Sequence, residues 1–251
     1  MLDLPFPVWT LIAVAAAFAL AGGVKGVIGM GLPTVAIGLL SSMMPPAQAA
    51  AILVLPSLVT NVWQMLAGPH FVALLKRLWP MMLGITGGAW AGAGIITGSN
   101  GGLALTALGV VLVVYAAVGL SAARLVVRPA WEKYLGLPVG IATGLVTGAT
   151  GVFVLPAVPY LQALDLERDA LIQALGLSFT VSTAAMGVAL AGAGVLAGEL
   201  AGVSVLALAA ALLGMWGGAK LRSRISAGTF RRFFFLGLLA LGLHLALRGV
   251  L

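Results

Sequence analysis

Apolar residues dominate the chain in long runs, and polar residues gather in the short segments between them. The long runs lie at 5–24, 47–67, 73–97, 102–126, 169–192, 199–219 and 229–249. A helix needs about 20 apolar residues to cross the hydrocarbon core of a bilayer. The pattern therefore predicts an all-α polytopic membrane protein.

Three further apolar runs are too short to cross. The runs 31–44, 134–147 and 151–164 hold about 14 residues each, and a helix of that length rises about 21 Å against a core of roughly 30 Å. Each short run adjoins a glycine-rich break. We therefore expect two helical hairpins, 5–44 and 134–164, that enter the membrane and return to the same face. Their irregular backbone has to be buried in protein or line a cavity.

A triplet of glycines with the spacing G-x3-G-x2-G occurs in both halves of the chain. The triplets are Gly22, Gly26 and Gly29 in the first half, and Gly144, Gly148 and Gly151 in the second. A proline follows each triplet, at Pro33 and Pro156. The flanking segments also follow in the same order, which favours a true repeat over a chance match among 35 glycines.

The repeat divides the chain into two membrane units. The first unit covers 1–127, with hairpin 5–44 and spans 47–67, 73–97 and 102–126. A polar joint covers 128–133. The second unit covers 134–251, with hairpin 134–164 and spans 169–192, 199–219 and 229–249. A returning hairpin and three spans make an odd number of crossings, so the fold is predicted to consist of two inverted-topology repeats.

The charge pattern agrees with this topology. Only 8% of the residues are charged, too few to cover a water-soluble domain of this size, and the net charge is +7. When the 220–232 loop is placed in the cytoplasm, every basic residue except Lys25 and Arg248 falls on the cytoplasmic side, Arg124 included, and the N-terminus falls outside. The basic balance therefore indicates membrane orientation and a lipid bilayer as partner, and no nucleic acid.

The glycine breaks are the leading candidate site. Glycine lets backbone amides approach a ligand closely, and a helix that starts after a break directs free N–H groups at an anion. The alternative is helix packing, because small residues let membrane helices touch. Lys25 in the first break would offer a positive charge to an anionic substrate, or would reach cytoplasmic water instead. The residue 122 positions later is Thr147, whose hydroxyl could contact the anion or bond back to its own helix.

Polar residues also follow each hairpin within an apolar span. Ser57, Thr60, Asn61 and Gln64 share one helix face through their i, i+3, i+4, i+7 spacing. In the second half the polar residues are Gln173, Ser178, Thr180, Ser182 and Thr183. Such a face lines a path or bonds a neighbouring helix. The predicted substrate-binding residues are Lys25, Gly26, Gly29, Gly31, Asn61, Gln64, Thr147, Gly148, Thr150, Gly151, Ser182 and Thr183.

The sequence offers no catalytic or metal-binding set. Cysteine is absent, His70 and His244 lie far apart, and no nucleophile–base pair or Walker loop is present. No carboxylate lies in the middle of an apolar run, so a proton relay through Asp or Glu is missing. We therefore expect no enzyme, no cofactor and no metal, and the coupling ion and oligomeric state stay open.

The two breaks and their surroundings resemble the sulfite exporter family (TauE/SafE), which includes toluene-sulfonate uptake permeases. The resemblance rests on Gly22–Pro33 (GGVKGVIGMGLP), Gly144–Pro156 (GLVTGATGVFVLP) and the basic loop Gly217–Ser226. It implies transport of small anions, often sulfur-containing, across a bacterial inner membrane. The expected function is a secondary transporter that works by alternating access on sulfite, a sulfonate or a sulfoacetate-like anion. The alternative is a channel-like or structural subunit of a larger membrane complex.

Overall fold

The computed structural model describes residues 6–98, 100–121, 125–196, 198–222 and 224–250. Arg124, which the charge pattern assigns to the cytoplasmic side, lies outside them. The described residues form ten α-helices and one short 3-10 helix, and no strand. The helices are α1 (Val8–Ile28), α2 (Leu32–Ser41), α3 (Pro46–Leu66), α4 (Phe71–Thr97), α5 (Gly101–Ser121), α6 (Pro129–Thr150), α7 (Ala157–Gln162), α8 (Arg168–Gly192), α9 (Ala201–Leu221) and α10 (Ala227–Val250).

Six of these helices are long and apolar enough to cross a membrane: α1, α3, α5, α8, α9 with the 3-10 turn before it, and α10. The chain is therefore a multi-pass membrane protein. Helices α4 and α6 are of similar length, with 27 and 22 residues, and they contain several glycines and threonines and two charged residues each.

The short helices that the sequence predicts are present in two of the three places. Helix α2 has 10 residues and α7 has 6. The prediction for 134–147 is wrong, because α6 begins earlier, at Pro129, and takes in most of the predicted joint 128–133. Proline at the first helical position and Glu132 in the first turn both favour a helix start there.

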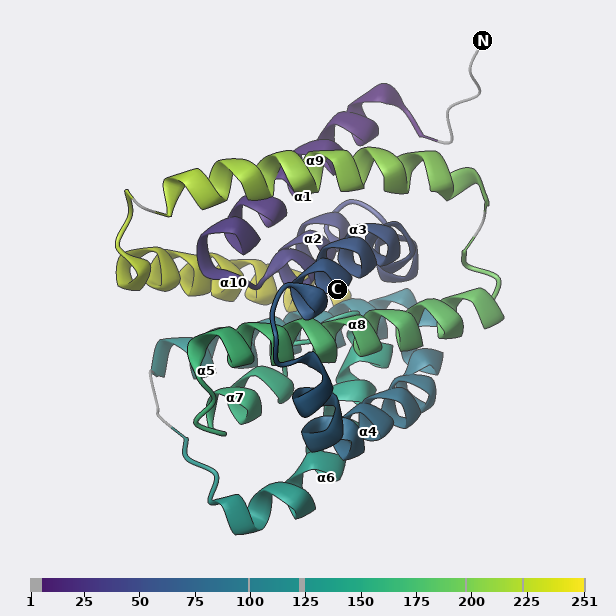
Figure 1. Cartoon of the computed structure of the whole chain (residues 1–251). Coiled ribbons are helices and arrows are strands. Elements are labelled where there is room, and N and C mark those ends of the chain that lie inside the picture. Colours follow the sequence, from purple (N-terminus) through teal and green to yellow (C-terminus); the bar gives the residue numbers. More distant parts are fainter. Residues whose placement is uncertain (1–5, 99, 122–124, 197, 223, 251) are drawn as a thin grey trace.

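The long helices pack in four pairs: α1 with α9, α4 with α6, α3 with α8, and α5 with α10 (Figure 1). Close contacts between glycines and neighbouring backbones give the directions. Gly22 lies against Ala211 and Gly26 against Met215, so α1 and α9 run parallel. In α4 and α6 the contact positions also rise together, from Gly84 with Leu137 to Gly92 with Leu145, so this pair is parallel too.

The other two pairs are antiparallel. Gly176 of α8 lies against Met65 of α3, whereas Gly187 lies against Val54. In α5 and α10, Gly102 lies against Gly249, and Gly119 lies against Phe235. The α4–α6 pair therefore has the same parallel arrangement as the α1–α9 pair, and each antiparallel pair joins a helix of the first half of the chain to a helix of the second half.

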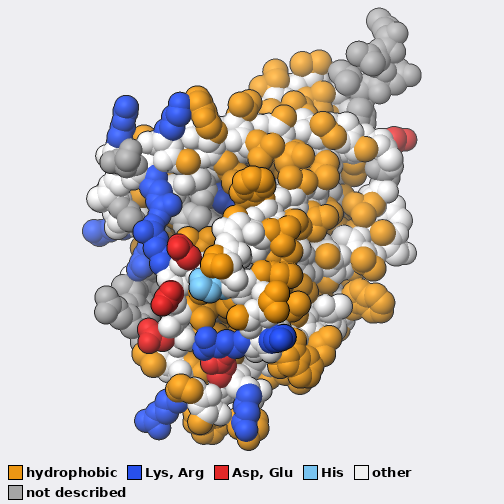
Figure 2. All heavy atoms as spheres, in the orientation of Figure 1, with side chains coloured by type: hydrophobic (Ala, Val, Ile, Leu, Met, Phe, Trp, Pro, Cys, Tyr) orange, Lys and Arg blue, Asp and Glu red, His pale blue; other side chains and the backbone are white. Residues whose placement is uncertain are grey.

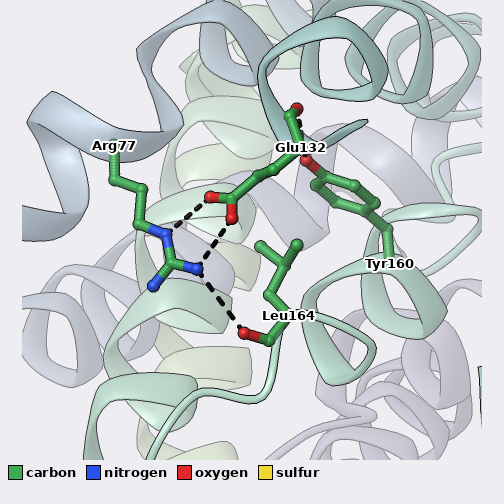
Figure 3. Close-up of polar contacts among 4 residues, drawn as sticks. All are labelled: Arg77, Glu132, Tyr160 and Leu164. Atoms are coloured by element: carbon green, nitrogen blue, oxygen red, sulfur yellow. Dashed lines mark hydrogen bonds and ion pairs between the residues drawn. The ribbon is translucent and has the colours of Figure 1, made fainter. Parts of the chain in front are cut away.

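Two polar contacts lie at the residues where the hairpin segments end. Arg248 near the end of α10 donates to the carbonyl oxygen of Ser42, directly after α2. At the opposite end, the Arg77 guanidinium of α4 binds both carboxylate oxygens of Glu132 in α6, at 2.5 and 2.8 Å, and reaches the Leu164 carbonyl after α7 at 3.5 Å (Figure 3). The Tyr160 hydroxyl donates to the Glu132 carbonyl at 3.1 Å.

Charged side chains are unevenly distributed. Lys and Arg gather along the left and lower edges of the view in Figure 2, where Figure 1 shows α6 and α10 beginning and α9 ending, while hydrophobic side chains cover the middle. Such a band of apolar surface bounded by charge is what a bilayer-embedded protein requires. The observed grouping follows the basic clusters that the sequence places together.

Candidate functional site

The two glycine triplets occupy matching places in α1 and α6, and their members differ in role. The third glycine ends each helix: Gly29 has φ 80° and Gly151 has φ 73°, and their N–H groups donate to Lys25 and Thr147 carbonyls, respectively. A left-handed residue after the last turn is a common helix stop, and glycine adopts it without strain. Gly31, with φ 99°, precedes α2 directly.

The first two glycines of each triplet lie inside the helices, not in the breaks. A methyl group added at Gly22 or Gly26 would overlap the carbonyl oxygens of Ala211 or Met215 in α9. In α6, Gly148 lies equally close to Ala89 of α4. The predicted breaks are therefore shorter than expected, and for these positions the packing interpretation holds. Small residues allow the backbones of membrane helices to touch.

Lys25 is buried in the last turn of α1. Its side chain is 4% exposed, so it does not extend to water. The Nζ atom donates to Thr60 Oγ1 at 3.1 Å and to Asn61 Oδ1, both on α3. Helix α2, which follows the break, rises about 15 Å over its 10 residues.

No buried carboxylate accompanies this lysine among the residues that the structure describes. Every described Asp and Glu is exposed or half-buried, and the one ion pair in that part of the chain joins Arg77 to Glu132. A buried ammonium without a carboxylate is costly unless other groups or a ligand supply negative charge. Thr60 and Asn61 supply oxygen atoms but no charge.

The polar face of α3 presents further unpaired groups beside Lys25. Asn61 Nδ2 and Ser57 Oγ are buried and have no hydrogen-bond partner among the described residues. On α8, Ser178 Oγ and Ser182 Oγ are also buried and have no hydrogen-bond partner among the described residues. Buried polar groups are nearly always paired, so unpaired ones call for an explanation such as a ligand or water.

The register of α3 against α8 brings these groups to the same level. Gly176 faces Met65 and Gly187 faces Val54, and 11 residues separate the two contact positions on each helix. Because the two contact positions are equally far apart on both helices, the antiparallel helices keep the same register between them, and the segment 57–61 of α3 lies alongside about 180–184 of α8. The crossing therefore places Asn61 and Ser57 at the level of Ser182.

The threonines of the second break are satisfied locally. Thr147 Oγ1 donates to the Thr143 carbonyl at 2.8 Å, and Thr150 Oγ1 to the Val146 carbonyl at 2.7 Å. The Val152 N–H donates to Thr150 Oγ1 at 3.2 Å. Thr183 likewise bonds the Phe179 carbonyl of its own helix. These hydroxyls follow the back-bonding alternative, which is the usual one for threonine in a helix.

The two glutamines join helices instead of meeting Lys25. Gln64 Nε2 donates to the Ile172 carbonyl at 3.0 Å. Gln173 Nε2 donates to the carbonyls of Met65 and Gly68 at 2.9 Å, and its Oε1 accepts from the His70 N–H at 2.8 Å. Gln173 therefore donates to carbonyl groups at the end of α3 that have no hydrogen-bond partner within α3.

Of the predicted residues, the structure brings Lys25 and Asn61 into contact and puts Ser182 at their level. Thr60, which also contacts Lys25, and Ser57 on the same polar face of α3 complete this group, which we name the Lys25 cluster. Sequence reasoning had placed Thr60 and Ser57 on the right helix face, but the spacing could not show which member would meet Lys25. Thr34 Oγ1 and Ser41 Oγ of α2 are also buried and unpaired in the described part of the chain, and no sequence pattern marked them.

A cleft of about 920 Å³ between α3 and α9 is lined by Thr60, Trp63, Leu212 and other apolar side chains. Its apolar lining and exposed position suit lipid chains better than an anion. The Lys25 cluster itself is closed to solvent, since Lys25 and Asn61 are 4% and 0% exposed. A ligand can reach it only after the helices move apart.

These features define a multi-pass helical membrane protein with two broken hairpins and a buried cationic cluster. The chain belongs to the sulfite exporter TauE/SafE family, whose model matches residues 14–245. The match covers nearly the whole chain and includes both glycine breaks, and it assigns the protein to a family of membrane transporters. No curated protein and no solved structure matches the chain.

Proposed function

We propose that the protein is a secondary transporter of a small anion, with the Lys25 cluster as its binding site. The observation that carries the proposal is a buried ammonium whose described partners are neutral oxygen atoms. An anion would supply the missing negative charge. It would also accept hydrogen bonds from Asn61 Nδ2 and from the Ser57 hydroxyl, which have no other described partner.

The size and chemistry of the cluster favour a compact oxyanion. Lys25 contacts the polar face of α3, which also carries the unpaired donors Asn61 Nδ2 and Ser57 Oγ, and an oxyanion such as sulfite or the head of a sulfonate can accept hydrogen bonds from donors of this kind. Charge-assisted hydrogen bonds of this kind are about twice as strong as neutral ones. The family assignment points in the same direction, since its name refers to sulfite export.

Alternating access would act through two inverted repeats. When α1–α5 are matched in order to α6–α10, the α1–α9 pair corresponds to the α6–α4 pair, and the α3–α8 and α5–α10 pairs each correspond to themselves. In this arrangement each hairpin returns to the end where it began. Inverted-repeat transporters rock one unit against the other around a central site built at broken helices. The burial of Lys25 in this conformation agrees with a state in which the site is closed to both sides. In a bacterium the protein would lie in the inner membrane, with its basic ends in the cytoplasm and its N-terminus outside.

Transport in proteoliposomes tests the proposal. Purified protein is reconstituted, and uptake of labelled sulfite, sulfoacetate and arenesulfonate is compared with that of Lys25→Gln. We expect saturable uptake of at least one anion. The variant should fold normally and lose about 30-fold or more in transport, because a desolvated charge contact contributes about 2–5 kcal/mol. Absence of saturable uptake for every anion, or full activity of Lys25→Gln, would overturn the proposal.

The alternative, a structural subunit, is favoured by the packing role of Gly22, Gly26, Gly144 and Gly148. Close helix contact explains why glycine occupies these positions, but it does not explain why Lys25 is buried or why buried serine hydroxyls lack partners among the described residues. If Lys25→Gln assembles and functions as the unsubstituted protein does, while Gly26→Ala disrupts assembly, the structural reading gains the advantage.

A further inference from the structure

A second cationic site lies where α5 ends and α10 begins. A cleft of about 660 Å³ is lined by Gly119 and Leu120 of α5 and by Arg231, Arg232 and Phe235 of α10, among others. Arg231 Nη2 donates to the Gly119 carbonyl at 3.3 Å, which holds one face of the guanidinium against the end of α5. The cleft is thus formed by two membrane-spanning helices and carries two positive charges.

Neither arginine has a carboxylate partner among the described residues. The ion pair between Arg77 and Glu132 is on other helices, and the described acids lie in α6, α8, the loop before it and the turn before α9. The Arg231 guanidinium has further N–H groups beyond the one bound to Gly119, and Arg232 has all of its own. Guanidinium groups bind phosphate oxygens in a two-pronged geometry.

Apolar side chains continue from the arginines along the membrane-facing surface. Leu120 is 37% exposed, Leu236 44% and Phe233 71%. A free phosphate ion would gain nothing from this surface, whereas the acyl chains of a phospholipid would lie against it. Basic pockets between transmembrane helices are a recognised form of anionic headgroup site.

We propose that this cleft binds the phosphate of an anionic phospholipid, with the acyl chains lying along α5 and α10. The inference is independent of the transport proposal, because it uses none of the Lys25 cluster. It would fix the α5–α10 pair to the lipid of one leaflet.

Thermal stability of the full chain in detergent, titrated with lipid, tests the inference. The variant Arg231→Gln/Arg232→Gln is compared with Arg222→Gln/Arg224→Gln, which removes the same charge from the same basic loop but outside the cleft. Phosphatidylglycerol should raise the Tm of the unsubstituted protein and of the control. In the cleft variant its apparent affinity should fall roughly 30-fold, since each arginine contributes about 1 kcal/mol. The single variant Arg232→Gln, which keeps the contact to Gly119, should fall roughly fivefold on the same basis.

Phosphatidylcholine and inorganic phosphate form the comparison arms. Neither should raise the Tm to the extent of phosphatidylglycerol. Equal stabilisation by phosphatidylcholine would show that the cleft does not recognise the negative charge of the headgroup. Equal stabilisation by inorganic phosphate would show that the acyl chains do not contribute to binding. Either result, or an equal loss of affinity in the Arg222/Arg224 control, would overturn the proposal.

Discussion

The breaks of the two hairpins have the same backbone plan and different chemistry. Both helices end at a left-handed glycine, and the residue four positions before that glycine is Lys25 in α1 and Thr147 in α6. Lys25 reaches across to Thr60 and Asn61 of α3, whereas Thr147 bonds its own helix. The two helices thus end in the same way, and of the two residues four positions before the end only Lys25 carries a charge.

The difference extends to the helices that follow the hairpins. At the same separation of 122 residues, Thr60 and Asn61 of α3 correspond to Ser182 and Thr183 of α8. The α3 pair binds the lysine, Ser182 is unpaired among the described residues, and Thr183 bonds Phe179. We infer that the first half of the chain supplies the positive charge that binds an anion. The second half supplies mainly helix packing and few unpaired hydrogen-bond donors.

The largest expected effect comes from neutralising Lys25 without removing it. Asn61→Asp places a carboxylate beside the ammonium, so the site would contain its own counter-ion and would no longer need a substrate anion. Transport should fall about 30-fold or more while the protein stays folded. Asn61→Ser, which adds no charge, should retain more transport than Asn61→Asp. Unchanged uptake by Asn61→Asp would show that Lys25 does not attract the anion.

The next effect concerns packing and should be the same in both halves. In Gly26→Ala and Gly148→Ala the new methyl group would overlap backbone oxygens of α9 and α4, so the helices must separate. Overpacking of this kind costs about 1–3 kcal/mol. Gly23→Ala is the matched control, since its nearest neighbour is 3.8 Å away. Thermal unfolding in detergent measures all three, and an equal loss for Gly23→Ala would contradict the close-contact explanation.

A smaller effect is expected where the second hairpin is held at its start. Glu132→Gln removes the charge from the paired contact with Arg77 (Figure 3). The Arg77 side chain is 42% exposed, so solvent screens the pair and the loss of stability should stay below about 1 kcal/mol. A double-mutant cycle with Arg77→Gln measures the coupling. A coupling of several kcal/mol would mean that the contact is shielded in the membrane.

The smallest effect is expected at the counterpart of Lys25. Thr147→Val removes a hydroxyl whose donor is already used within α6, so transport should stay within about threefold of the unsubstituted protein. Kinetics in proteoliposomes, measured beside Lys25→Gln, provide the check. A loss as large as that of Lys25→Gln would mean that both halves bind the substrate directly, and the contrast between the hairpins would fail.

The membrane class, the approximate positions of the long helices and the two short helices after the breaks can be predicted from the amino-acid sequence without a structure. These features depend on hydropathy and length, which are properties of contiguous residues. The repeated glycine spacing also marks Gly29 and Gly151, which both end a helix in the structure. The charge pattern predicts a polar joint at 128–133, whereas α6 begins at Pro129, because a membrane helix can carry charged residues in its first turn.

Tertiary structure alone decided what each glycine and each polar side chain does. Whether Gly26 binds a ligand or packs on a helix depends on the position of α9, which begins 175 residues later. The partners of Lys25 are 35 and 36 residues away in the sequence, and they meet it because α2 brings the chain back so that α3 lies beside α1. A hydroxyl's choice between its own helix and a neighbour depends on how two helices cross, and the crossing is fixed by side chains from the whole chain.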